Sequence, residues 1–242
     1  MRLNLRFVWA FAKFNGISWI RRSPANILSP VVTSLCLLFI IYFLSGGRLV
    51  DYAVVGGVIA IMASTSMMNT GQTAMMRLEY RIHDLIVATK ATALEYVVAL
   101  STSDLVFSVP GIAIFTLLSL IFGLFTLQRF AATVAVLLLL ALGTTSIAFS
   151  FGSRIRRTIG MWAISGILSA LLTLLSPTFY PYTALPQPIL YVLALSPVTP
   201  AAVVLQGVYG LAPMNYPMVL LLVAEVAAYT MIAMRFARWA EH

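Results

Sequence analysis

Charged side chains are scarce in this sequence. Its 242 residues include 15 Lys and Arg and 7 Asp and Glu, so that 9% are charged whereas 61% are hydrophobic. A soluble domain does not carry so much apolar surface, because its exterior faces water. The composition therefore excludes an ordinary soluble protein and predicts an all-α integral membrane protein, in which helices satisfy their own backbone hydrogen bonds.

Cysteine and histidine are nearly absent as well. The single cysteine, Cys36, lies in an apolar run, which excludes a disulfide framework and a cysteine-based metal site. One of the two histidines is the last residue, His242, and neither a His-Glu-x-x-His motif nor a close carboxylate pair occurs within a span. A Gly-x-x-x-x-Gly-Lys-Ser/Thr phosphate loop is also missing. These absences predict that the chain is not an enzyme and has no catalytic residues, metal site or cofactor of its own.

Long apolar stretches dominate what is present. A helix needs about 20 apolar residues to cross a hydrocarbon core roughly 30 Å thick. Six stretches are predicted to do so: 26–44, 51–76, 103–126, 131–149, 159–175 and 218–234. They leave no room for a soluble catalytic domain, so residues 1–242 are interpreted as a single transmembrane domain.

Residues 1–24 precede the first span and are predicted to form an amphipathic helix on the membrane surface. Aromatic and aliphatic side chains recur there at helical spacing, and basic residues surround them. The apolar stripe consists of Leu3, Phe7, Phe11 and Phe14. A cleaved signal peptide is the competing interpretation, but both the basic region and the following apolar run are too long for one.

The most charged segment lies between the second and third spans. Apolar and hydroxyl side chains recur at helical spacing within it, which predicts a short amphipathic helix. These residues are Leu78, Ile82, Leu85 and Thr89. Thr92 and Glu95 have the spacing of a capping box, which predicts that another helix begins there and enters the membrane.

Basic residues are distributed unevenly along the chain. All Lys and Arg except Arg48 and Arg129 lie in the N-terminal segment, in residues 77–95, in residues 152–157 or near the C-terminus. Because cytoplasmic segments carry the excess of Lys and Arg, these segments and both termini are predicted to be cytoplasmic, in a multi-pass protein of the plasma (inner) membrane. The same rule explains the net charge of +8, so no nucleic-acid partner is expected.

Residues 177–217 contain eight prolines and no charged residue. The segment is apolar but is interrupted too often for a span, which predicts short re-entrant helices at 186–195 and 200–209 on the outer side. Its four tyrosines are interpreted as an aromatic belt at the outer interface, with a ligand cage as the alternative. They are Tyr180, Tyr182, Tyr191 and Tyr209.

Polar residues inside spans have two interpretations. Residues 62–73 are rich in Met, Ser and Thr, which suits either close helix packing or the lining of a translocation path. Glu225 is an acidic residue deep in the last span, where an isolated charge costs roughly 2.5–3.5 kcal/mol. It is expected either to be a hydrogen-bonded structural residue, with Tyr229 as a partner, or to contact a substrate or a coupled ion. The candidate path residues are Met67, Asn69, Thr70 and Glu225.

Two stretches resemble the membrane subunit of the type-2 ABC exporters, the permeases of the drug, polysaccharide and lipid export class. Residues 85–96 resemble the family's Leu-Leu-x-Thr-Pro … Leu-Glu segment between spans two and three. Residues 179–199 resemble its outer-loop pattern of aromatic-Pro, Leu-Pro and then Asn-Pro-x-Thr. Three positions depart from the family, which often has Pro, Asn and a basic residue where this chain has Lys90, Ser196 and Gln206.

The resemblance implies a membrane-spanning permease subunit of an ATP-driven exporter. Two permease copies, as a homo- or heterodimer, would bind two separate ABC ATPase subunits, and ATP-Mg would be held by those partners. A coupling region at 77–92 would sit in a cleft of the ATPase, whose closure would move spans two and five and open a path between the copies. The residues implied in coupling are Glu79, Arg81, Ile82, Asp84, Leu85, Thr89 and Glu95.

The outer helices of residues 177–217 would form an exit lid in this scheme. Two other functions stay open: a substrate-binding membrane component of a vitamin or metal uptake system, and a membrane scaffold that transports nothing. The sequence does not name a substrate, although a path with few charges suggests an amphipathic or lipid-like one.

Overall fold

The computed structural model describes residues 4–22, 25–89, 91–157 and 159–236. Within these ranges the secondary structure is helical and contains no strand. The N-terminal helices are α1 (Leu5–Ala12), the π-helical turn η1 (Lys13–Ile17) and α2 (Ser18–Arg22). The others are α3 (Ala25–Ser45), α4 (Val50–Leu78), α5 (Ile82–Ala88), α6 (Ala93–Ile121), α7 (Leu127–Gly152), α8 (Met161–Leu174), the 3₁₀ turn η2 (Tyr182–Ala184), α9 (Gln187–Leu193), α10 (Val198–Val208) and α11 (Tyr216–Phe236).

Five helices, α3, α4, α6, α7 and α11, are long and apolar enough to cross a membrane, which confirms the all-α membrane fold. The fifth predicted span is shorter than expected, because α8 has 14 residues and is therefore about 21 Å long. Helix α8 begins directly after Gly160. The φ of +88° at Gly160 is incompatible with a right-handed helix, so α8 does not extend into the preceding loop.

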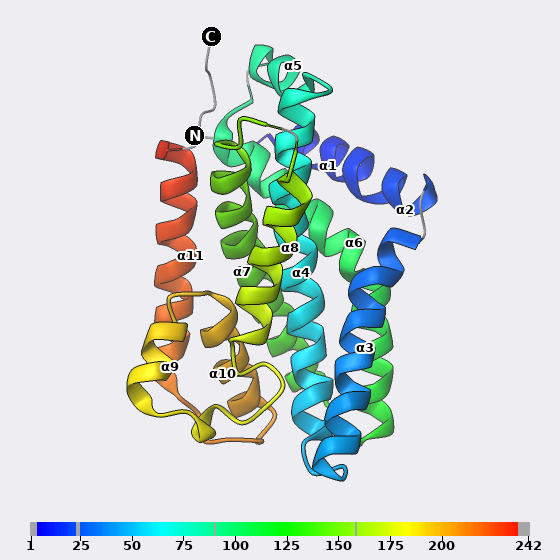
Figure 1. Ribbon diagram of the computed structural model, residues 1–242, viewed down its shortest axis with the longest axis vertical. Coiled ribbons are helices and arrows are strands. Elements are labelled where there is room, and N and C mark those ends of the chain that lie inside the picture. The colour runs from blue at the N-terminus through cyan, green and yellow to red at the C-terminus, as the bar shows by residue number, and fades with distance from the viewer. Residues whose placement is uncertain (1–3, 23–24, 90, 158, 237–242) are drawn as a thin grey trace.

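The long helices run side by side around α4 (Figure 1). Helices α3, α6, α7 and α8 all contact α4, and α11 packs against α7. At one end of the bundle, called here the α5 end, α1 and α2 lie across the helices and α5 projects beyond them (Figure 1). Helices α9 and α10 lie at the opposite end, called the α9 end.

The central position of α4 depends on small residues. A Cβ on Gly56 would lie 1.8 Å from the carbonyl oxygen of Thr178, and a Cβ on Gly152 would lie 2.6 Å from that of Thr70. Such close approaches of backbone are possible only without a side chain, as in other membrane helix contacts. As a result α4 is the most buried of the five long helices.

Helix α6 begins earlier than the predicted third span. Thr92 and Glu95 form the predicted capping box, and the helix runs from Ala93 through Ser103 without a break. Asp104, which was expected near the membrane interface, lies three turns inside α6 and is only 5% exposed. The polar residues in the first turns of α6 lower the local hydropathy, although neighbouring helices bury them. Hydropathy alone therefore placed the start of the third span near residue 103, ten residues after the helix begins.

The helix pair predicted for residues 177–217 is present as α9 and α10, which meet at a bend of 119°. Gln206 of α10 organises the proline-rich loop before them. Its amide nitrogen donates to the carbonyl oxygens of Pro177 and Tyr180, at 2.7 and 2.9 Å, and its oxygen accepts from the Tyr182 N–H at 3.0 Å. This departure from the family pattern therefore satisfies buried backbone groups of the loop.

Candidate functional site

Helix α5 forms an elbow between the two longest helices. The backbone of Arg81 takes a φ of +51°, which turns the chain back after α4 and starts α5. Arg81 and its two predecessors, Glu79 and Tyr80, are exposed. Within α5, Leu85 is 68% exposed whereas Ile86 is buried, so one side of the helix packs on the bundle and the other faces outward.

The structure places the predicted coupling residues on different surfaces. Glu79, Arg81, Leu85 and Thr89 are exposed at the elbow. Ile82 is half-buried and packs against the core beneath α5. Asp84 belongs to α5, but its side chain lies outside the described part of the chain, as does Lys90.

An aromatic and aliphatic cluster connects α5 with the N-terminal helix. Ile86 of α5, Phe11 of α1 and Tyr96 of α6 belong to one buried cluster. The Tyr96 ring contacts Phe11 edge-on with centroids 5.2 Å apart, and contacts Phe149 of α7 in the same way at 5.5 Å. Side chains of α5, α1, α6 and α7 therefore share one buried cluster.

Glu95 is an internal residue, not part of the exposed side of the elbow. Its Oε2 accepts from the backbone N–H and the hydroxyl of Thr92, at 2.8 and 3.0 Å. Its Oε1 accepts from the backbone N–H of Asn4 at 2.7 Å. The carboxylate thereby starts α6 and holds the beginning of α1 against it.

Arg77, at the end of α4, binds the loop between α7 and α8. Its guanidinium donates to the carbonyl oxygens of Ser153 and Ile155, just beyond the end of α7. A cation beside the exposed carbonyls of a helix C-terminus is favoured by the helix dipole. The end of α4 is thus tied to the basic loop that leads to α8.

A second polar group lies deeper in the bundle, where α4, α6 and α7 meet. Asp104 Oδ2 accepts from Asn69 Nδ2 and from Thr145 Oγ1, each at 2.7 Å. Of the predicted path residues, Met67, Asn69 and Thr70 are all buried in the bundle. They face neighbouring helices of the same chain in this conformation.

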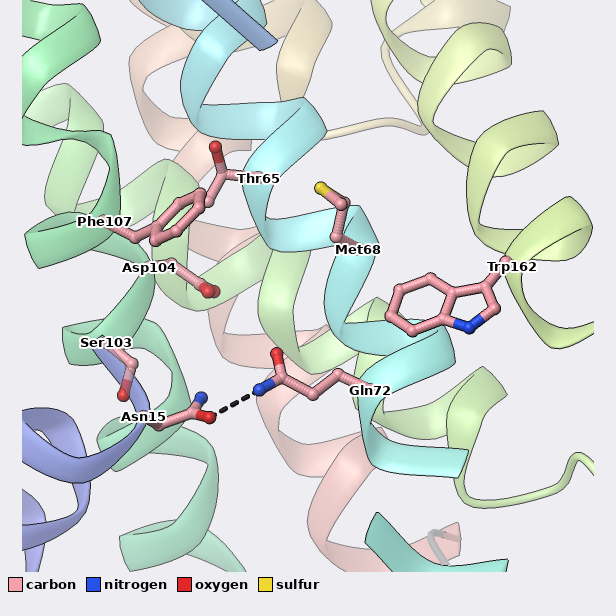
Figure 2. A pocket seen from close by; sticks show the side chains of 8 residues that line it. All are labelled: Asn15, Thr65, Met68, Gln72, Ser103, Asp104, Phe107 and Trp162. Atoms are coloured by element: carbon pink, nitrogen blue, oxygen red, sulfur yellow. Dashed lines mark hydrogen bonds between the residues drawn. The ribbon is translucent and has the colours of Figure 1, made fainter. Parts of the chain in front are cut away.

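Helix α4 also lines two cavities that the sequence did not reveal. The smaller, of about 50 Å³, lies between the N-terminal helices, α4, α6 and α8 (Figure 2). Its lining residues are Asn15, Thr65, Met68, Gln72, Ser103, Asp104, Phe107 and Trp162. The larger, a groove of about 470 Å³ between α3, α4 and α8, shares Met68 and Trp162 with it. Ser64, Met68 and Gln72 are spaced four residues apart, so they lie along one face of α4 and line these two spaces.

Asn15 reaches the smaller cavity from the π-helical turn η1, and its side-chain oxygen accepts a hydrogen bond from the Gln72 amide (Figure 2). A π-helical turn inserts an extra residue into the helix and frequently marks a functional site. Gly16 allows the turn to approach α6, because a Cβ there would lie 3.3 Å from the Ser103 carbonyl oxygen. The N-terminal helix therefore forms one wall of the cavity.

Glu225 is buried in α11 but lines neither cavity. Its Oε2 has no hydrogen-bond partner among the described residues. The predicted bond with Tyr229 is not formed, because the Tyr229 hydroxyl donates to the carbonyl oxygen of Leu195 instead. The bend between α9 and α10 leaves that carbonyl available, and sequence spacing on α11 alone could not show it.

Among the residues that the structure describes, no three His, Cys, Asp or Glu side chains are grouped so as to hold a metal ion.

Comparison with known proteins agrees with this architecture. The family model described as ABC-2 type transporter matches residues 6–209, which include the N-terminal helix, the elbow and α10. A search of curated proteins finds no match. The chain belongs to the ABC-2 type transporter family and is a multi-pass permease, the transmembrane component of an ABC transporter.

Proposed function

We propose that this permease is the membrane subunit of an ATP-driven exporter, in which α5 couples each permease copy to a separate ATPase subunit. The observation that carries the proposal is the two-sided packing of α5. Leu85 is exposed at the tip of the elbow, while Ile86, its neighbour, is buried in the cluster shared with α1 and α6. A helix that presents an apolar side chain outward and anchors the next one inward suits a docking contact.

The distribution of basic residues supports a cytoplasmic position for α5. The elbow, the 153–157 loop and the N-terminal helices share the α5 end of the molecule (Figure 1). These segments hold most of the Lys and Arg residues, so we assign the α5 end and both termini to the cytoplasm, in the plasma membrane. ATP-Mg is expected on the partner, which leaves this chain without a cofactor.

In this proposal, movement of α5 on ATPase closure displaces the helices of the bundle. Ile86 of α5 belongs to the same buried cluster as Phe11 and Tyr96, and the bonds of Glu95 to Asn4 and Thr92 join the segment after the elbow to α1 and α6. Movement of α8 away from α4 would then widen the groove between them. Their contact is close, since a Cβ on Gly71 would lie 2.9 Å from the Trp162 ring.

Two permease copies are expected to share the substrate path. The buried α4 residues Met67, Asn69 and Thr70 would become accessible when the helices separate, and α9 and α10 would close the outer exit. Substrates with a long apolar part suit a path with so few charges.

The experiment is copurification of the permease with the ATPase of the same transporter. Glu79, Arg81 and Asp84 are replaced together by residues of opposite charge (Glu79→Lys, Arg81→Glu, Asp84→Lys). Loss of complementary charge at a protein interface is expected to reduce the copurified ATPase at least about tenfold. The melting temperature of the permease should not change, because Glu79 and Arg81 are exposed.

The matched control is Arg48→Glu, a charge reversal at an exposed residue in the turn before α4, at the other end of the bundle. This variant should retain the ATPase. Undiminished copurification with the triple variant contradicts the proposal.

A further inference from the structure

We propose that the small cavity beneath the Asn15–Gln72 contact binds the primary ammonium group of a single-chain amphiphile. The inference rests on the proposed function, since the amphiphile would be the transported substrate. It is carried by the geometry of Asp104 and by the continuity of the cavity with the apolar groove.

Asp104 supplies the negative charge. Its side chain projects from α6 toward the space between Gln72 and Met68 (Figure 2). The hydrogen bonds to Asp104 come from Asn69 and Thr145, which are neutral. A buried carboxylate with neutral partners is costly, and a cation beside it removes much of that cost.

The remaining walls of the cavity suit an ammonium group. Such a group has three N–H donors and no acceptor. The Gln72 nitrogen is engaged with Asn15, which leaves the amide oxygen of Gln72 turned toward the cavity (Figure 2). Trp162 and Phe107 present aromatic rings, which also attract cations.

Hydrogen bonding distinguishes the head groups. A primary ammonium group can donate to the carboxylate of Asp104 and to the amide oxygen of Gln72. A trimethylammonium group has no N–H donor and offers neither acceptor a hydrogen bond. The structure therefore favours an unsubstituted amine over a quaternary one.

The adjoining groove suits the apolar chain of the same molecule. Several of the hydroxyl groups that line it donate to carbonyl oxygens of their own helices. Thr33 donates to Ser29 at 2.8 Å, Ser64 to Ala60 at 2.7 Å and Ser165 to Met161 at 3.0 Å. These donors are already satisfied, so a hydrocarbon chain beside them does not deprive them of a partner. The shared residues Met68 and Trp162 join head-group and chain sites.

The test measures binding to the purified full chain in lipid nanodiscs, without the ATPase. Trp9, Trp19 and Trp239 are replaced by Phe so that the fluorescence reports Trp162 alone. The probes are dodecylamine, dodecanol and dodecyltrimethylammonium. Dodecylamine is expected to bind at least about tenfold more tightly than the other two, the lower limit for hydrogen bonds to a charged group.

Two variants of opposite effect decide the role of the charge. Asp104→Asn keeps the shape and an acceptor for Thr145, and should reduce dodecylamine binding to the level of dodecanol. Gln72→Glu adds a carboxylate to the same cavity and should strengthen dodecylamine binding several-fold, which keeps the inference testable if Asp104→Asn does not fold. Equal binding of the three probes, or equal loss of dodecylamine and dodecanol in Asp104→Asn, overturns the inference.

Failure of this inference differs from failure of the proposed function. A permease that copurifies with its ATPase but does not distinguish the three probes refutes only the amine site. A permease that discriminates the probes but does not bind the ATPase refutes the coupling role of α5.

Discussion

The backbone N–H of Asn4 donates a hydrogen bond of 2.7 Å to Glu95 Oε1, which joins the first turn of α1 to the first turn of α6. The other carboxylate oxygen completes the capping box with Thr92. Asn4 itself caps α1, because its side-chain oxygen accepts from the Phe7 N–H at 3.2 Å. One carboxylate thus fixes the end of the elbow and the position of the N-terminal helix at once.

Replacement of Glu95 by Ala is expected to loosen both helices. The variant loses the capping box and leaves the Asn4 N–H without its acceptor, at a cost of about 1–2 kcal/mol. Backbone amides of α1 and of the first turn of α6 should then exchange hydrogen about 5–30 times faster. Hydrogen–deuterium exchange of the detergent-solubilised chain measures this.

Asp51→Ala is the control for Glu95→Ala. Asp51 is also an acidic residue in the first turn of a long helix, but no side-chain cap hydrogen bond is formed at that helix start. Exchange in α1 should be unchanged in this variant. Equal protection of α1 in Glu95→Ala and the parent chain would refute the role assigned to Glu95.

The left-handed backbone of Arg81 separates two contributions to the elbow. Arg81→Gly and Arg81→Val both remove the charge, so both should weaken ATPase binding. Only Val is strained at a φ of +51°, by roughly 1–2 kcal/mol. Exchange in α5 should therefore be faster in Arg81→Val than in Arg81→Gly. If the two variants exchange at the same rate, the turn at Arg81 does not hold α5 in place.

Two helical glycines are predicted to respond in opposite ways to alanine. In Gly56→Ala the new methyl group meets the backbone oxygen of Thr178 at 1.8 Å, which requires α4 to move and should cost about 1–3 kcal/mol. In Gly166→Ala of α8 the methyl group has no atom within 4 Å, so stability should be unchanged or rise by up to about 1 kcal/mol. Melting temperatures in one detergent compare the two, and a similar loss in both would contradict the close contact of α4.

Local signals explain which parts of the fold were predictable. The capping box of Thr92 and Glu95 and the prolines before α9 act within a few residues, so spacing alone located the starts of those helices. The elbow helix was predicted for the same reason. The role of this helix in coupling stays a prediction, and so do the coupling roles of the exposed residues Glu79 and Leu85.

Contacts across helices explain what was missed. Asp104 looked like an interfacial residue because its partners, Asn69 and Thr145, lie 35 and 41 positions away in the chain. Tyr229 was expected to bond Glu225 one turn away, but a carbonyl oxygen exposed at the α9–α10 bend is its acceptor. Gln206 showed no function in the sequence, since its three backbone partners come together only when the proline-rich loop folds over α10.

The sequence by itself determined that the chain lies in a lipid bilayer, which segments are helical and which family the chain resembles. Apolar length, cap spacing and short motifs are all properties of neighbouring residues. Only the tertiary structure decided which residues of α4 line a cavity and which are packed, and that Asp104 and Trp162 border the same space. The physical reason is that a polar residue in a membrane helix must find its partner on another helix, and the packing of the bundle selects that partner.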